Sequence, residues 1–162
     1  MRLRAPFLAA VFATLAGTAA ASEAALQAFS QHCFSPFLTA ARADAVLPAR
    51  HDFYDLRPFR ASNPVSPPEG RAATPGTDRR CEVAFDGRAV AAGMETISQA
   101  LAREGIVTQA PVPAGFPLMA GTEFAAARQL NPRRIAVVQV GTRPGPNGPE
   151  TFLNVERLDP LP

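Results

Sequence analysis

The stretch GTDRRCEVAFDG, residues Gly76–Gly87, carries the clearest evidence for the fold. Cys81, Val83 and Phe85 stand at every second position, and the residues between them are small or acidic. A period of two is that of a β-strand, so the segment predicts a strand with one face in the core and the other mostly in water. This strand also places one of the 2 cysteines of the chain on its core face.

The segment that follows, GRAVAAGMETISQALAREG, predicts an amphipathic helix. Its large apolar residues recur every three or four positions from Val90 to Leu101. Asp86 stands where an N-cap is expected, and Gly105 suits the left-handed residue that often ends a helix.

Apolar residues also recur at helical spacing in SEAALQAFSQHCFSPFL, which begins at Ser22. Ser35-Pro36 has the form of an N-cap followed by a first-turn proline. We therefore expect two short helices, or one kinked helix, over roughly residues 23–34 and 36–45.

A second strand is predicted in RHDFYDLRPF, where Phe53, Tyr54 and Leu56 make the segment dense in aromatic and apolar residues. The next segment, 58–77, contains five prolines and no apolar period. It predicts a long, extended loop. Residues 111–118 form a second proline-rich connector.

The C-terminal third predicts further strands. RRIAVVQVGT is apolar on both faces, as in a central strand, and TFLNVERL pairs with it across a turn at Asn147-Gly148. Residues 123–130 suit a helix by alanine content and a strand by alternation, and we favour a strand. The predicted fold is α+β: an antiparallel sheet of four or five strands, two or three helices on one face, and one disulfide.

The N-terminus has the layout of a secretory signal peptide. Arg2 and Arg4 precede an uncharged run that ends in small residues suited to cleavage after Ala21. We expect residues 1–21 to be removed, which leaves 22–162 as a single domain in the periplasm or outside the cell. The residue directly after the cleavage point is Ser22 and not a cysteine, so a lipid anchor is not expected. Retention of the segment as an N-terminal anchor is the alternative.

Removal of this segment would also abolish the net charge. The chain has 16 basic residues, all of them arginine, and 14 acidic ones; the segment contains two of the arginines and no acidic residue, so 14 remain against 14. A neutral surface offers no general field for nucleic acid or anionic lipid. We expect no nucleic-acid partner and no membrane span after cleavage.

In an oxidising compartment the two cysteines most simply form one disulfide, Cys33–Cys81. Both lie on predicted core faces, and the closed loop of about 48 residues corresponds to about 4 kcal/mol in the chain-entropy model. A cysteine nucleophile with His32 as its base is the alternative. It has less support, because adjacent helical residues point about 100° apart and no C-x-x-C is present.

Another catalytic grouping is His51, Asp52 and Asp55, which supports a hydrolase-type enzyme as an alternative function. A metal site built from these residues and His32 is not expected. On a strand, His51 and Asp55 would stand about 13 Å apart, and the sequence has no metal-ligand motif. We assign no catalytic residue and expect no cofactor.

Two arginine pairs, Arg79-Arg80 and Arg133-Arg134, each precede a predicted strand. If those strands are neighbours, the four guanidinium groups could form an anion-binding site. Solvated arginines that protect strand ends are the alternative.

Three segments, FSQHC, CEVAFDG and ISQALAREGI, resemble small exported proteins of uncharacterised function from alphaproteobacteria. The resemblance spans Ala28–Ile106 and implies a disulfide-held α+β domain, with no activity attached. We expect a small periplasmic or secreted binding or interaction module that contacts a protein or a small molecule through its proline-rich loops. A structural factor of the cell envelope is a further alternative.

Overall fold

The computed structural model describes residues 11–59 and 63–159, with side chains described from residue 19 onward. The first two arginines of the predicted signal peptide lie outside the described residues. The elements, in chain order, are α1 (Val11–Ala28), the π-helical turn η1 (Phe29–Cys33), α2 (Ala40–Val46), β1 (His51–Asp55), β2 (Thr77–Asp86), α3 (Val90–Arg103), β3 (Gln109–Ala110), β4 (Thr122–Asn131), β5 (Arg134–Gly145) and β6 (Gly148–Leu158).

The described strands form one antiparallel sheet of six strands in the order β1-β2-β6-β5-β4-β3. This confirms the α+β class, but the predicted number of four or five strands was wrong. The strand that the prediction did not include is β3. It has two residues, which is too short for a period of two to be recognised in the sequence. Residues 123–130 belong to strand β4, as favoured.

The middle of the sheet consists of β2, β6 and β5. In β2, Cys81 lies between Phe53 of β1 and Val155 of β6. Strands β5 and β6 form the predicted hairpin, and Gly148 begins β6 with a φ of 118°, a left-handed conformation that glycine adopts without strain. The segment RRIAVVQVGT, the clearest predicted strand, forms most of β5, an inner strand whose middle, residues 136–141, is buried.

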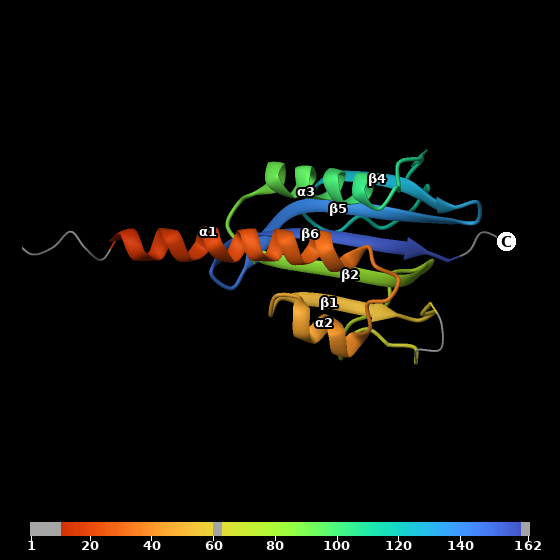
Figure 1. Ribbon diagram of the computed structural model, residues 1–162, viewed down its shortest axis with the longest axis horizontal. Helices are drawn as coiled ribbons and strands as arrows, with labels where there is room; N and C mark the ends of the chain where they lie inside the picture. Colours follow the sequence, from red (N-terminus) through yellow and green to blue (C-terminus); the bar gives the residue numbers. More distant parts are fainter. Residues whose placement is uncertain (1–10, 60–62, 160–162) are drawn as a thin grey trace, which may run out of the picture.

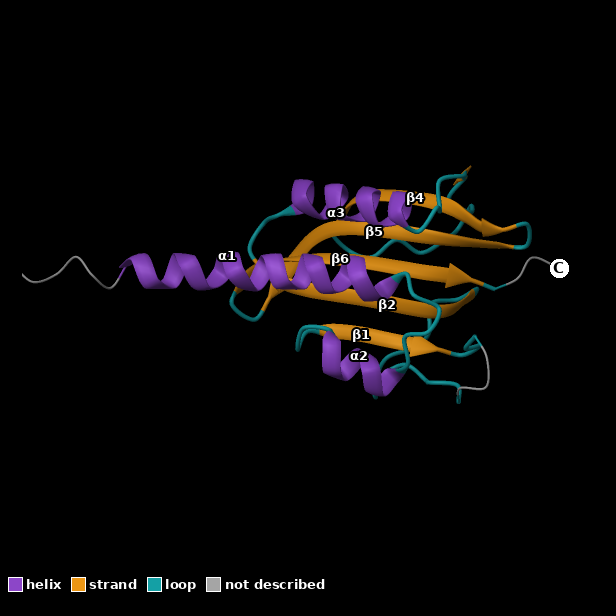
Figure 2. Ribbon diagram, in the orientation of Figure 1, coloured by secondary structure: helices purple, strands orange, loops and turns teal. Residues whose placement is uncertain are grey.

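The helices cover one face of the sheet, as Figure 1 and Figure 2 show: α1 and η1 lie along β6 and β2, α3 lies along β5 and β4, and α2 lies beside β1. From α1 and η1 the chain buries Ala25, Phe29 and Cys33, which are four residues apart and form one helical stripe. From α3 it buries Ile97 and Leu101.

Gly93 is the exception in the well-patterned helix α3. It is buried, and a Cβ placed there would stand 2.8 Å from Val140 Cγ1 and 3.3 Å from Leu153 Cδ1. Because glycine has no side chain, α3 can approach β5 and β6 closely. The packing gained offsets the low helix propensity of glycine, which costs about 1 kcal/mol relative to alanine.

The predicted start of the second helix at Ser35-Pro36 was wrong. The Ser35 Oγ accepts a hydrogen bond from the Phe37 backbone N–H and closes a turn instead. The helix α2 begins at Ala40, where Thr39 is the N-cap and its Oγ1 accepts from the Arg42 N–H. The hydroxyls of Ser35 and Thr39 each accept a hydrogen bond from a nearby backbone N–H. Only the Thr39 contact lies at the start of a helix.

Asp86 is not the cap of α3. That helix begins at Val90, and the N–H of the preceding Ala89 donates to the Thr151 hydroxyl of β6. Asp86 instead pairs with Arg50 at 2.7 Å. At the other end, Gly105 has the predicted left-handed conformation, with a φ of 69°.

The face of the sheet away from the helices is buried as well, so the predicted wet face of β2 was wrong. Glu82 and Ala84, on this face, are 3% and 4% exposed. Arg71, in the first proline-rich segment, reaches Asp52 on this face, and Met119, directly after the second, donates its N–H to Gln139 Oε1. Loops that the sequence predicts to be extended thus exclude water from the second face.

The first of these loops is partly ordered by pairing. Residue 77 belongs to β2, so the loop is shorter than predicted, and Val65 forms a bridge with Asp55 through two backbone hydrogen bonds. Of the helices that the structure describes, none combines the length and the apolar character needed to cross a membrane.

Candidate functional site

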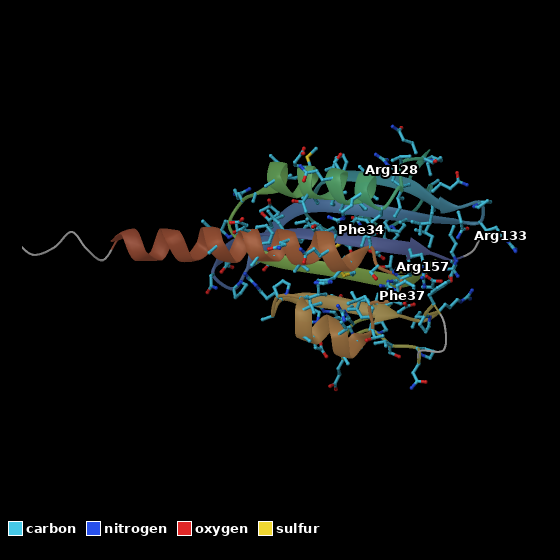
Figure 3. The ribbon with its side chains drawn as sticks, in the orientation of Figure 1. Phe34, Phe37, Arg128, Arg133 and Arg157 are labelled. Atoms are coloured by element: carbon cyan, nitrogen blue, oxygen red, sulfur yellow. A yellow bond between two sulfur atoms is a disulfide. The ribbon has the colours of Figure 1, made fainter. Side chains whose placement is uncertain are left out.

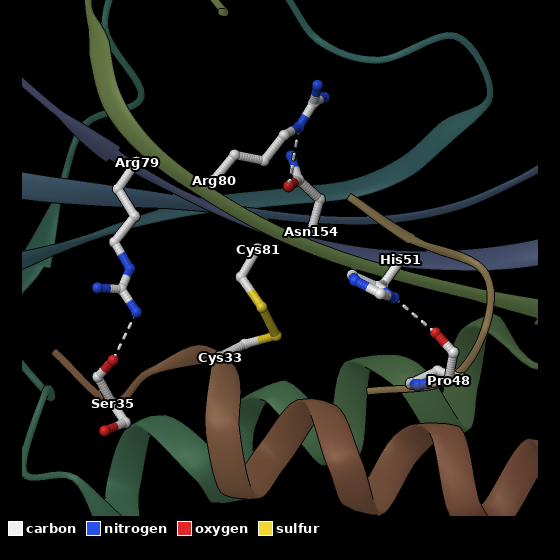
Figure 4. The surroundings of a disulfide bond; sticks show 8 residues. All are labelled: Cys33, Ser35, Pro48, His51, Arg79, Arg80, Cys81 and Asn154. Atoms are coloured by element: carbon white, nitrogen blue, oxygen red, sulfur yellow. Dashed lines mark hydrogen bonds between the residues drawn. A yellow bond between two sulfur atoms is a disulfide. The ribbon is translucent and has the colours of Figure 1, made fainter. Parts of the chain in front are cut away.

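The disulfide Cys33–Cys81 joins η1 to β2 (Figure 4), and its Cα atoms are 5.4 Å apart. Cys33 is 3% exposed and Cys81 is fully buried. The predicted pairing is confirmed, and both sulfur atoms are engaged in it. The bond fixes the end of the first helical segment over the middle of the sheet.

Beside this disulfide, where η1 ends, a cavity of about 690 Å³ opens over the sheet. We call it the arginine pocket. Its walls combine two kinds of side chain: an apolar group made up of Cys33, Phe34, Pro36, Pro58, Phe59, Ile106, Leu130, Ala136 and Val155, and a polar group made up of Arg57, Arg79, Asn131, Arg134 and Arg157. Among the described residues, its lining contains four cationic groups and no carboxylate.

Several of the lining residues belong to segments without regular structure, among them two phenylalanines. Phe34 follows η1 directly, and Phe59 follows β1 and makes an edge-on contact with Phe37 at a centroid distance of 5.6 Å. Figure 3 shows Phe34, Phe37 and Arg157 gathered near this end of the sheet. Phe37 and Phe59 are each more than half exposed, so the rim of the pocket presents aromatic rings to solvent.

Beneath the pocket, five charged side chains alternate in sign: Arg79, Asp55, Arg157, Asp78 and Arg134. We call them the ion-pair chain. The successive N···O distances are 2.7, 3.0, 2.6 and 2.6 Å. Both carboxylates are almost fully buried. Buried charges are costly unless each has a partner, and here every link supplies one.

The two ends of the ion-pair chain differ. Arg79 is buried, and its Nη2 and Nη1 also donate to the carbonyl oxygens of Ser35 and Pro36, at 2.6 and 3.5 Å. Its guanidinium lies over the Phe53 ring at 5.2 Å. Burial lowers the pKa of Arg79, and the adjacent Asp55 opposes that shift. Arg134, at the other end, is 21% exposed and faces the pocket.

The structure brings together two of the four arginines predicted to form an anion site. Arg79 and Arg134 both line the pocket. Arg80 does not join them, because successive residues of a strand point to opposite faces, and Figure 4 shows it beside Asn154 on the face away from the helices. Arg133 is exposed at the turn between β4 and β5, and the pocket lining does not include it.

Sequence reasoning missed Arg57 and Arg157. Arg157 lies two residues beyond Val155, on the same face of β6, and its partner residues across the sheet are Arg79 and Ala136. The alternation in TFLNVERL contained this signal, but only the register of β6 against β2 shows which arginines become neighbours.

The residues of the hydrolase alternative do not converge on one point. Asp52 is on the face away from the helices, whereas Asp55 is on the helix face within the ion-pair chain. The imidazole of His51 contacts the Pro48 carbonyl oxygen and the Asp44 carboxylate, at 2.8 and 3.2 Å. Within the described part of the chain, no group of three or more histidine, cysteine, aspartate or glutamate residues could hold a metal ion.

The face away from the helices contains a second set of buried polar side chains. Arg80 stands among three buried carboxylates, those of Asp52, Glu82 and Glu156, at N···O distances of 3.5, 3.7 and 3.5 Å. We call this set the Arg80 cluster. Arg143 adds a shorter contact to Glu82, at 2.7 Å. Burial raises the pKa of Glu82, and its two arginine neighbours only partly offset that effect.

The Arg80 cluster has less complete pairing than the ion-pair chain. Among the described residues, Asp52 Oδ1 and Glu156 Oε2 are buried without a hydrogen-bond partner. No cavity of the size of the arginine pocket is found beside them in the described structure. The arginine pocket lies on the helix face, and a second cavity, of about 490 Å³, lies beside the turn between β5 and β6 and is lined in part by Arg143.

Comparison of the chain with models of protein families, with curated proteins and with solved structures gave no match. The geometry of the arginine pocket is thus the basis for a functional assignment.

Proposed function

We propose that this protein is a small periplasmic or secreted binding module, and that the arginine pocket holds its ligand. The observation that supports this most directly is the pocket itself, which joins apolar walls to a row of arginines in a volume of about 690 Å³. Sites for small molecules typically occupy about 300–1,000 Å³ and combine apolar walls with a few polar groups.

The rigid surroundings of the pocket favour binding without a large rearrangement. One wall is tied to the sheet by the Cys33–Cys81 disulfide, and four adjacent strands, β2, β6, β5 and β4, contribute side chains to the lining. Walls held in this way lose little conformational entropy when a ligand enters.

Export is supported by how α1 is buried. The first buried residue of this helix is Ala25, whereas Ala19, Ala20 and Ala21 are exposed. Figure 1 shows the first part of α1 extending past the sheet. Cleavage after Ala21 would therefore remove no buried side chain described here, and the stripe that packs on the sheet would remain.

The test uses mature protein, residues 22–162, prepared from the periplasm and checked by mass. A panel of small apolar and amphipathic compounds is screened by thermal shift, and hits are measured by calorimetry. Phe59→Ala, in the pocket lining, should weaken binding, whereas Leu118→Ala should not. Leu118 is a matched control because it is exposed to the same degree, 51% against 52%, and lies outside the pocket.

The proposal fails if no compound shifts the melting temperature and periplasmic cross-linking captures no partner. It also fails if binding is found but Phe59→Ala and Leu118→Ala leave it equally unchanged, because the ligand would then sit elsewhere.

A further inference from the structure

The ion-pair chain has one more positive group than negative groups. Three arginines share two aspartates, and both ends of the chain are arginines. At the Arg79 end, two backbone carbonyl oxygens satisfy the guanidinium. The charge that lacks a counter-ion is therefore at the Arg134 end, where the guanidinium also lines the pocket.

Arg134 has donors available at that end. Asp78 engages its Nη1, and within the described residues neither Nε nor Nη2 has a hydrogen-bond partner. Two parallel N–H groups on one edge of a guanidinium match the two oxygens of a carboxylate. The Arg57 guanidinium makes a long contact to the Asp159 carboxylate, at 3.7 Å, and the Arg57 side chain is 60% exposed.

Much of the rest of the pocket lining is apolar. Phe34, Ile106, Leu130 and Val155 belong to it, and none of them offers a side-chain hydrogen bond. A ligand with a charge at both ends would leave one charge against these side chains without a partner, which is costly.

We infer that the ligand of the arginine pocket is an organic monoanion, a carboxylate joined to an apolar body, whose carboxylate binds Arg134 and whose body lies against the apolar lining. One negative charge would complete the alternation of the ion-pair chain, with three anionic and three cationic groups. The inference rests on the proposed function, since it names the class of ligand for the same pocket.

The experiment compares three probes of equal chain length: decanoate, decan-1-ol and decylamine. Calorimetry at neutral pH, supported by displacement of the amphipathic anion anilinonaphthalenesulfonate, measures the affinity of each for the mature protein. Decanoate should bind about 10-fold or more tightly than decan-1-ol, the size of effect expected when a charge-assisted hydrogen-bond pair is added. Decylamine should bind most weakly, because four arginines line the pocket.

Arg134→Gln should reduce decanoate affinity to about that of decan-1-ol and leave decan-1-ol unchanged. Arg133→Gln is the matched control: it removes the same charge from the neighbouring residue, which is outside the pocket lining, and should leave all three affinities unchanged. Arg134→Lys keeps the charge without the paired donors and should give an intermediate decanoate affinity.

Salt provides a readout that needs no variant. Added sodium chloride should weaken decanoate binding and leave decan-1-ol binding unchanged or stronger. Equal affinities for decanoate and decan-1-ol, or an equal loss of decanoate binding in Arg133→Gln and Arg134→Gln, would overturn the monoanion inference and leave the pocket as a ligand site. Failure of all three probes and of anilinonaphthalenesulfonate to bind would instead count against the proposed function itself.

Discussion

The two faces of the same sheet are buried by different means. On the helix face, apolar side chains pack against α1, η1 and α3, and charged residues are confined to one end, where the ion-pair chain lies under the arginine pocket. On the other face, proline-rich loops form the cover, and a transverse row of polar side chains, Asp52, Glu82, Asn154 and Gln139, is buried in the middle of the sheet.

This difference shows what loops and helices can each supply. A helix presents a continuous apolar stripe, so the strand residues beneath it are apolar and a gap beyond the helix end becomes a pocket. A loop presents backbone N–H and C=O groups and isolated side chains, so the strand residues beneath it include hydrogen-bonding partners. The contact from the Met119 N–H to Gln139 is one example.

The largest effect is expected from removing the Cys33–Cys81 disulfide on the helix face. The double variant Cys33→Ala with Cys81→Ala should lower the free energy of unfolding by about 4 kcal/mol, because the unfolded chain regains the entropy of a closed loop. Urea unfolding followed by circular dichroism measures this. Wild-type protein in reductant is the companion sample, and equal midpoints with and without reductant would show that the disulfide contributes nothing.

The next largest effect is expected on the loop face. Arg80→Gln removes the guanidinium shared by three buried carboxylates and should cost about 3 kcal/mol of unfolding free energy. Arg88→Gln, at an exposed arginine two residues beyond the end of β2, is the control and should change stability by less than about 0.5 kcal/mol. If the two variants unfolded at the same urea concentration, the Arg80 cluster would not stabilise this face.

A smaller effect separates the middle of the ion-pair chain from its open end. Arg157 lies between both aspartates, so Arg157→Gln should cost about 2 kcal/mol, whereas Arg134→Gln removes a single partly exposed link and should cost about 1 kcal/mol or less. Paired urea titrations give the ranking. The reverse order would mean that Arg134, rather than Arg157, holds the two aspartates.

The smallest effect concerns pH. Because burial raises the pKa of Glu82 above its ordinary value of 4.5, the folded protein binds this proton more tightly than the unfolded chain does. The contribution of Glu82 to stability is therefore greatest below the unfolded pKa and declines as pH rises through the folded pKa. Glu82→Gln cannot ionise, so its stability relative to wild type should improve as pH rises from 4.5 toward neutrality. Unfolding free energies measured across this range would show a flat difference if Glu82 is not perturbed.

Much of the fold follows from periodicity in the sequence. The alternation at Cys81, Val83 and Phe85 predicts the strand, its core face and the side on which the disulfide forms, and each agrees with the structure. What periodicity cannot reveal is what lies on the second face. Glu82 alternates with core residues as a solvent-facing residue would, and its burial depends on loops distant in the sequence.

The candidate site was only half predictable for a related reason. The pairs Arg79-Arg80 and Arg133-Arg134 are visible as local features. Adjacent residues of a strand point to opposite faces, so Arg80 faces away from Arg79, and Arg133 stays in the turn before β5. Arg157 stands alone in the sequence and becomes part of the site through strand register, which long-range pairing sets.

The ring closed by Cys33 and Cys81 encloses β1 and the whole exposed segment 63–76. A protease that cuts the backbone within that segment would release no fragment, because the pieces on either side of the cut stay joined by the two sulfurs. The nicked protein would migrate as one species until it is reduced, and β1 would keep its place against β2. Cleavage within this segment would therefore leave both sides of the arginine pocket in one covalently joined molecule.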